Sequence, residues 1–240
     1  MKNSELANKI GSYFSGKQEF TTREVTNALQ EYLPGVSTNT ISWRINQLKK
    51  EKLLFQKGRG LYTFKYKPEF SPELSLKAKR TYNKIKAIYT GKLVVWDTDL
   101  LKEIAGVDLP KHWIFIGLRK EDLDSLFEEL KSSSKPVYIQ PDKETINRYI
   151  LPQEAAVILT PLISEAPTVL VGEYQFPSIE GILVNAWFEY EQFLQPFGIE
   201  IHKLYENAFA KYNVNKSKLL RYAARRDKRK EINELLKSIE

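Results

Sequence analysis

The sequence predicts an α/β protein of two domains, α+β over the whole chain, with a small N-terminal domain before a larger one. Residues 20–64 contain signals for two capped helices followed by a hairpin with glycines. Residues 93–160 alternate short apolar runs with helical segments, which is typical of a mixed or largely parallel sheet. Two prolines and weak hydrophobic periodicity mark a hinge at 66–73, so the predicted domains are 1–67 and 68–240.

Two helices of the N-terminal domain begin at recognisable caps. Thr21 and Glu24 have the spacing of a capping box, in which each side chain bonds the backbone N–H of the other residue. That helix ends at Pro34-Gly35, and Ser37 caps the helix that follows. The close succession of the two helices predicts a helix-turn-helix.

A hairpin follows the helices. Leu53–Gln56 and Leu61–Lys65 are predicted strands, and residues 57–60 form the turn, where glycine tolerates positive φ. An amphipathic helix near residues 1–14 completes the domain. This order of elements predicts a winged helix-turn-helix.

The second helix of the pair has one apolar face and one polar face. Ile41, Ile45 and Leu48 share the face expected to pack inward. The opposite face carries short polar side chains of the kind that contact base edges in the major groove. The predicted DNA-binding residues of helix and hairpin are Thr38, Asn39, Thr40, Trp43, Arg44, Gln47, Lys57 and Arg59.

Charge favours DNA as the partner of this domain. The chain has 37 Lys and Arg against 30 Asp and Glu. Residues 1–67 hold 12 basic and 5 acidic residues, a net of 12 − 5 = +7, which equals the net charge of the whole chain. Phosphate binding requires such an excess. The alternative is a winged helix used for protein contact, with a polar face that is simply solvated.

Predicted strands and helices alternate along most of the larger domain. Its predicted strands are 93–96, 113–118, 137–139 and 155–160. Its predicted helices are 74–89, 98–105, 121–131, 178–193, 201–212 and 217–238, with a helical turn at 145–149.

Catalytic signals are sparse. The chain has no cysteine, and its two histidines stand far apart without partners at metal-ligand spacing. Asp97 and Asp99 follow a predicted strand and offer one alternative, a Mg²⁺-dependent nuclease or nucleotidyltransferase. Helix capping explains the pair more simply. We therefore expect no enzyme activity, no metal and no cofactor.

Nothing in the sequence predicts a membrane segment. No apolar run reaches the length needed to span a bilayer, and the N-terminus lacks the apolar region of a signal peptide. The absence of cysteine fits a reducing compartment. We therefore expect a cytoplasmic protein.

The C-terminal part is also basic. Residues 203–230 contain 10 basic and 2 acidic residues. One interpretation is a surface for DNA or an acidic partner protein, and the other is neutralisation of the acidic segment 68–202 from within the domain. The candidate surface residues are Lys218, Arg221, Arg225, Arg226 and Lys228.

Two segments together resemble the AbiEi family of type IV toxin–antitoxin antitoxins. They are TNTISWRINQLKKEKLLFQKGRGLYTF and FPSIEGILVNAWFE, the latter followed by YNVNKSKLLRYAARR. The family's helix motif is similar to P-T-L-E-K-x-L-V-D, which here runs from Pro177 to Asn185, with Gly181 in place of lysine and Asn185 in place of aspartate.

The resemblance implies a protein without catalytic activity that has two roles. It would repress its own operon by binding inverted repeats in double-stranded DNA, and it would antagonise a nucleotidyltransferase-like toxin. In this family the antagonism is described without a stable complex between toxin and antitoxin. A further alternative is a winged-helix regulator whose larger domain senses a small ligand near Trp96, Trp113 and Trp187.

Overall fold

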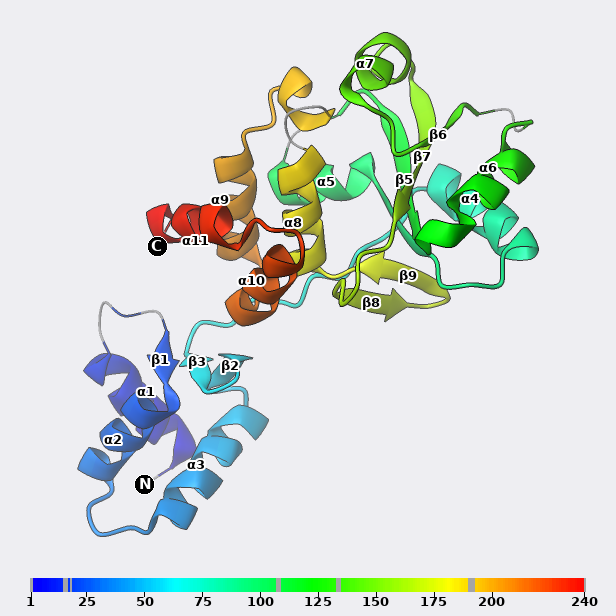
Figure 1. The fold of residues 1–240 in the computed structure, drawn as a ribbon. Helices are drawn as coiled ribbons and strands as arrows, with labels where there is room; N and C mark the ends of the chain where they lie inside the picture. Colours follow the sequence, from blue (N-terminus) through cyan, green and yellow to red (C-terminus); the bar gives the residue numbers. More distant parts are fainter. Residues whose placement is uncertain are drawn as a thin grey trace. The chain divides into compact units, whose positions relative to one another are not determined.

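The computed structural model describes residues 2–14, 17, 19–106, 109–132, 135–189 and 193–239. The chain forms two compact units, residues 1–69 and 70–240 (Figure 1). The first is called unit 1 and the second unit 2. The division falls inside the hinge region that the sequence predicts at 66–73.

Unit 1 is a winged helix. Three helices, α1 (Asn3–Tyr13), α2 (Thr22–Tyr32) and α3 (Thr38–Lys50), pack around one apolar core (Figure 1). An antiparallel sheet in the order β1-β3-β2 completes the unit. Its strands are β1 (Phe20–Thr21), β2 (Phe55–Gly58) and β3 (Leu61–Thr63).

The turn of the hairpin is shorter than the sequence indicates. Strand β2 continues through Lys57 to Gly58, so that Arg59 and Gly60 alone make the turn. Only Gly60 of the two hairpin glycines has positive φ, at 72°. Lys57 therefore lies within the strand, and the prediction that it stands at the tip of the wing is wrong.

Unit 2 is built on a mixed four-stranded sheet in the order β4-β5-β7-β6. The strands β5 (His112–Leu118), β7 (Ala155–Pro161) and β6 (Val137–Ile139) run parallel. Strand β4 (Val94–Asp97) lies antiparallel at the edge, against β5. The predicted α/β class is confirmed, and the sheet is mixed because the first strand enters in the opposite direction.

Helices cover the sheet on two sides. Helices α4 (Leu76–Ile88) and α6 (Leu123–Leu130) lie on one side, and α5 (Thr98–Ala105), α8 (Ile179–Glu189) and α9 (Ile201–Lys211) on the other (Figure 1). Short turns join several elements. They are η1 (Lys120–Asp122), α7 (Lys143–Thr145), the π turn Ile146–Ile150 and η4 (Gln195–Phe197).

A second hairpin has no counterpart among the predicted elements. Strands β8 (Thr168–Val171) and β9 (Tyr174–Pro177) pair antiparallel, and β9 lies beside β4. Gly172 has φ +61° in the connecting turn, a conformation that glycine adopts without strain. The hairpin leads directly into α8.

The C-terminal segment contains two helices where the sequence predicts one over 217–238. Helix α10 (Lys216–Arg225) ends before α11 (Arg229–Ser238) begins, and Asp227 between them has φ +54°. The prediction of one continuous helix is thus wrong, and the break separates Lys228 from Arg225. The predicted helix over 178–193 corresponds to α8, and its residues 190–192 lie outside the described residues.

Candidate functional site

Helix α3 carries most of the residues that the sequence predicts to bind DNA. Ser37 caps the helix by accepting the N–H of Thr40 at 3.2 Å. Ile41, Ile45 and Leu48 are buried, so that the helix is anchored along one side as the sequence predicts. The opposite side is left open.

The open face of α3 is polar and aromatic. The predicted contacts Thr38, Asn39 and Thr40 are exposed at the start of the helix, and Trp43 is 52% exposed one turn later. An exposed aromatic side chain at this position could contact a base or a sugar. Gln47 lies partly buried at the edge of this face.

Arg44 points toward α1. Its Nη1 atom donates to Oδ1 of Asn3 at 2.9 Å, and its guanidinium carbon lies 5.1 Å from the ring centre of Trp43. Its Nε atom is buried without a hydrogen-bond partner. The structure thus places Arg44 between α1 and the exposed tryptophan, where it fixes the orientation of the helix.

The two predicted wing residues have different surroundings. Lys57 is buried, with its side chain 8% exposed, and its Nζ atom lies 2.6 Å from Oε1 of Glu19. Arg59 is exposed in the turn. Arg59 is therefore the predicted wing residue that a phosphate can reach. Lys57 instead connects strand β2 to Glu19, the residue directly before β1.

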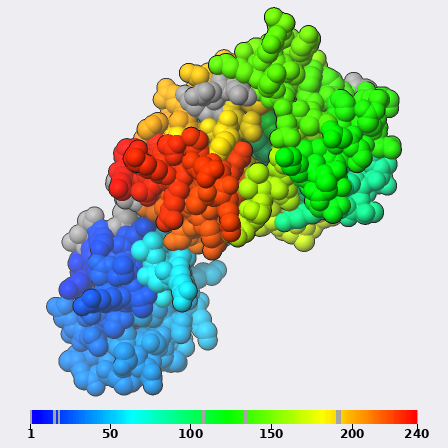
Figure 2. Space-filling model, in the orientation of Figure 1, coloured from blue at the N-terminus to red at the C-terminus, as the bar shows by residue number. Residues whose placement is uncertain are grey.

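The basic C-terminal residues are mostly engaged within unit 2. Lys218 pairs with Glu180 at 2.8 Å, Arg225 pairs with Glu165, and Lys228 pairs with Glu231 at 2.8 Å. In Figure 2 the orange and red surface of α10 and α11 borders the yellow surface of α8.

Arg226 is held most specifically. Its Nη1 atom donates to Oδ1 of Asn185 at 2.9 Å, and its guanidinium lies 3.6 Å from the ring centre of Phe188. Of the five candidates, Arg221 is exposed and forms no ion pair with another of the described residues. The ion pairs of Lys218, Arg225 and Lys228 favour neutralisation from within over a free basic surface.

Asp97 has the contacts of a structural residue. It is buried, its Oδ1 accepts the N–H of Leu100 at 3.3 Å, and its Oδ2 accepts the N–H of Ser75 at 3.1 Å. Burial raises the pKa of this carboxyl, against the lowering effect of the hydrogen bonds from Ser75. Asp99 instead faces His112, with 3.7 Å between Oδ1 and Nδ1.

Metal ligands do not gather around these aspartates. Across the described ranges, no three His, Asp or Glu side chains stand close enough together to hold an ion. Asp97 joins the starts of α4 and α5, which is the capping role that its position after a strand indicates.

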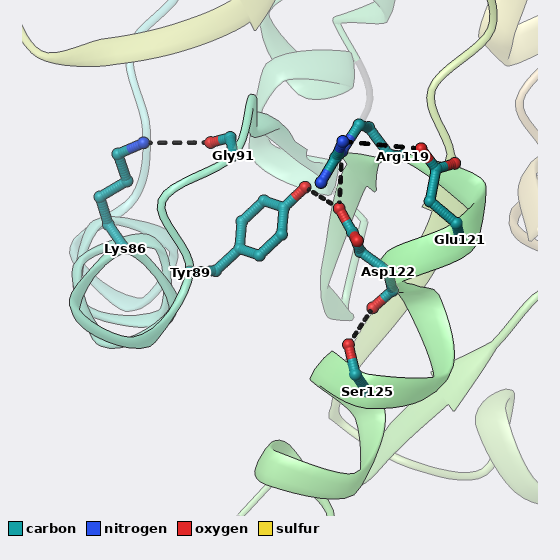
Figure 3. A network of polar contacts seen from close by, with 7 residues as sticks. All are labelled: Lys86, Tyr89, Gly91, Arg119, Glu121, Asp122 and Ser125. Carbon is teal, nitrogen blue, oxygen red and sulfur yellow. Dashed lines mark hydrogen bonds and ion pairs between the residues drawn. The ribbon is translucent and has the colours of Figure 1, made fainter.

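A polar network links the C-terminal end of α4 to the start of α6 (Figure 3). Tyr89 donates to Oδ2 of Asp122 at 2.6 Å, and Nε of Arg119 donates to the same oxygen at 2.8 Å. The Tyr89 hydroxyl and then Arg119 lower the pKa of Asp122. Arg119 and Asp122 are only three residues apart, but Tyr89 lies 33 positions before Asp122, so no local sequence pattern predicts the contact with Tyr89.

Sequence reasoning also missed a basic cleft beside α4. A cavity of about 320 Å³ has an apolar floor from Ile85, Leu130 and Val157. Four cationic side chains line it, three of them at helical spacing along α4: Lys77, Arg80, Lys84 and Lys135. Burial lowers the pKa of Lys135, and Lys77 and Arg80 lower it further. The i, i+3, i+7 spacing is the signal that could have revealed this cleft.

The three tryptophans proposed as a ligand pocket do not converge. Trp113 is fully buried against Phe193 and Phe197, and Trp187 packs edge-on to Tyr205. Trp96 lines a cavity of about 240 Å³, and neither Trp113 nor Trp187 lies in its lining. Core packing accounts for the other two.

Fold and site together define a two-unit α/β protein with an N-terminal winged helix. Residues 40–240 match the model of a family of unknown function, DUF6577, and the chain belongs to that family. No curated protein matches the chain. Among the described residues, no helix is long and apolar enough to cross a membrane.

Proposed function

We propose that this protein binds double-stranded DNA through α3 and represses its own operon as the antitoxin of a type IV toxin–antitoxin system. The observation that carries the proposal is the open polar face of α3 on a winged helix with a net charge of +7 over residues 1–67. In this proposal the protein is cytoplasmic, has no catalytic activity, and counteracts a nucleotidyltransferase-like toxin.

The placement of side chains supports a division of labour. Asn39 and Trp43 would contact bases, because an amide can bond adenine at two positions and a recognition helix uses its early residues. Arg59 would contact phosphate from the wing. Arg44 would act by holding Trp43, since its own guanidinium already bonds Asn3.

Binding of the full chain to its own upstream DNA tests the DNA-binding part. Gel shifts at moderate salt should show preference for an inverted repeat over random duplex. Asn39→Ala should weaken specific binding by about 1–3 kcal/mol. Asn27→Ala removes an exposed amide from α2 in place of α3 and serves as the matched control, which should retain binding.

Loss of the wing contact should change DNA binding in a different way. Arg59→Ala should lower affinity for all sequences alike and reduce the slope of log K against log salt by about 1. Equal affinity for the inverted repeat and random DNA in the unaltered protein would contradict the proposed repressor role.

The antitoxin part needs a test in cells. If the neighbouring reading frame encodes a nucleotidyltransferase-like protein, its expression alone should arrest growth, and co-expression of this chain should restore it. Rescue by a variant that no longer binds DNA would separate antagonism of the toxin from repression. Continued arrest on co-expression would refute the antitoxin role and leave DNA binding standing.

A further inference from the structure

The cavity lined by Trp96 has a floor made by one face of the central sheet. Two rows of paired residues cross β4, β5 and β7 there. The first row is Val94, Gly117 and Thr160, and the second is Trp96, Phe115 and Ile158. The rings of Trp96 and Phe115 stack with centres 4.1 Å apart and planes 8° from parallel. Each ring therefore covers one face of the other, and with Val94 and Ile158 the two rings make an aromatic and apolar floor.

The cavity lies toward the carboxyl ends of the parallel strands. Gly117 is next to last in β5, Thr160 is next to last in β7, and Gln140 directly follows β6. All three line the cavity. Ligands of open α/β sheets bind at this end of the strands, where backbone groups and loops are available.

Helices α8 and α10 supply an organised polar wall. Oδ1 of Asn185 accepts hydrogen bonds from Tyr222 at 3.0 Å and from Arg226 at 2.9 Å. Phe188 supports the other side of the Arg226 guanidinium. One acceptor and one ring thus fix the arginine, and both Asn185 and Arg226 line the cavity.

The charge of Arg226 is not neutralised by an ion pair within the part of the chain that the structure describes. Glu189 lines the same cavity and is partly buried. Burial raises the pKa of Glu189 to about 7, although Arg226 opposes the shift. Because the Glu189 carboxyl resists ionisation, it does not balance the positive charge of the Arg226 guanidinium. The cavity can therefore accept one anionic group of a ligand.

The size of the cavity restricts the ligand. Its volume of about 240 Å³ corresponds to that of roughly eight water molecules and lies just below the usual range of ligand pockets. A single ring with one small substituent fits such a space, and an aromatic floor favours a planar ring. We propose that this cavity binds a small single-ring aromatic carboxylate, with the ring on Trp96 and Phe115 and the carboxylate on Arg226.

A carboxylate suits the wall better than a phosphate. One guanidinium can bind a carboxylate through two parallel hydrogen bonds. A phosphate monoester carries more charge and would lie beside Glu189, where Arg226 is the one cation among the described residues that line the cavity. The proposal is independent of DNA binding, because every residue it uses belongs to unit 2.

Titration calorimetry of the full chain with benzoate, salicylate and nicotinate tests the site. At least one of these probes should bind with one-to-one stoichiometry at millimolar concentration or below. Benzamide, which lacks the charge, and phenyl phosphate should bind more weakly. Arg226→Gln should weaken binding by about ten- to a hundredfold, because a charge-assisted bond is lost.

Two further variants make the test decisive. Arg225→Gln removes the neighbouring arginine, which pairs with Glu165, and it should leave binding unchanged. Ala166→Phe adds a ring at a residue that lines the cavity, and it should abolish binding even if Arg226→Gln does not fold. Absence of saturable binding by all three probes would refute the proposal, as would unchanged binding by Ala166→Phe or a preference for phenyl phosphate.

Discussion

The ammonium of Lys218 lies 2.8 Å from the carboxylate of Glu180, a residue near the start of α8 that is only 3% exposed. The same carboxylate accepts the hydroxyl of Ser178 and, at 3.0 Å, the N–H of Asn215, which caps α10. One carboxylate thus joins the starts of two helices that are far apart in sequence. A lysine that the sequence suggests for a partner surface instead compensates a buried charge.

Lys218→Met should destabilise unit 2 by about 3 kcal/mol, because removal of one partner leaves the buried carboxylate without its cation. The partial exposure of the Lys218 side chain, 35%, places the effect at the lower end of the range for buried pairs. Urea unfolding of the full chain measures the change in free energy of unfolding.

Arg221→Met is the matched control for Lys218→Met. It removes an exposed cation from the same helix and should change stability by less than about 0.5 kcal/mol. Combining Lys218→Met with Glu180→Gln should recover part of the loss, since the uncharged amide has no need of a cation. An equal effect of the two single cation variants would show that the pair contributes nothing.

Gly181 should be intolerant of any side chain. A Cβ atom at this position would lie 2.8 Å from the carbonyl oxygen of Pro167 and 3.1 Å from Cβ of Pro177. Gly181→Ala should therefore destabilise the protein by roughly 1–3 kcal/mol, although alanine favours helix by about 1 kcal/mol. Thermal unfolding followed by circular dichroism measures the loss.

Gly11 provides the opposite case in α1. Apart from the helix's own backbone and the two neighbouring residues, no atom of the described residues lies within 4 Å of a Cβ built there, so Gly11→Ala should raise stability by about 0.5–1 kcal/mol through helix propensity alone. If both glycine variants stabilise the chain, α8 does not pack against Pro167 as closely as described. The same packing gives a physical reason for glycine where the antitoxin motif has lysine.

Local signals predicted the starts of helices well. The Thr21–Glu24 capping box, the Ser37 cap and the Asp97 cap all form, because each partner lies three residues away and the geometry of the first turn brings them together. The winged helix and the alternation of strands and helices in the larger domain could be predicted from such cap signals and from the periodicity of apolar residues.

Contacts between distant segments could not be predicted in the same way. Lys57 pairs with a residue 38 positions away, and Arg44 bonds one 41 positions away. From sequence alone, both look like exposed cations on a DNA-binding surface. The break at Asp227 and the antiparallel direction of β4 likewise depend on tertiary packing, which helical period and apolar alternation do not encode.

Glu24 makes the stability of unit 1 depend on pH in the acid range. Its carboxylate pairs with Lys17 and accepts the N–H and hydroxyl of Thr21, both at 2.8 Å. The hydrogen bond from Lys17, followed by those from Thr21, lowers the pKa of Glu24 from 4.5 to about 2. The stabilisation is present above pH 4.5 and should be lost as pH falls toward 2.

Glu24→Gln tests this link. The stability difference between the unaltered chain and this variant should be largest near neutral pH and should shrink between pH 4.5 and 2. Glu31→Gln, which changes an exposed carboxyl on the same helix, controls for general charge effects. A difference that stays constant with pH would mean that the glutamate contributes through shape and not through its charge.

Glu189 should give a pH dependence of opposite sign. Burial raises its pKa from 4.5 in the unfolded chain to about 7 in the folded one, so the folded state binds the proton more tightly. Its contribution is therefore most favourable below pH 4.5 and is lost as pH rises through 7. Across that window the loss should be on the order of 2 kcal/mol.

Glu189→Gln keeps the size of the side chain and removes its charge. Its stability relative to the unaltered chain should increase steadily from pH 4.5 to 7 and level off above, as measured by thermal unfolding at a series of pH values. Glu206→Gln, an exposed carboxyl on α9, should show no such trend. If Glu189→Gln shows none either, then Arg226 or water stabilises the ionised carboxylate, and the cavity wall carries a negative charge that would repel an aromatic acid.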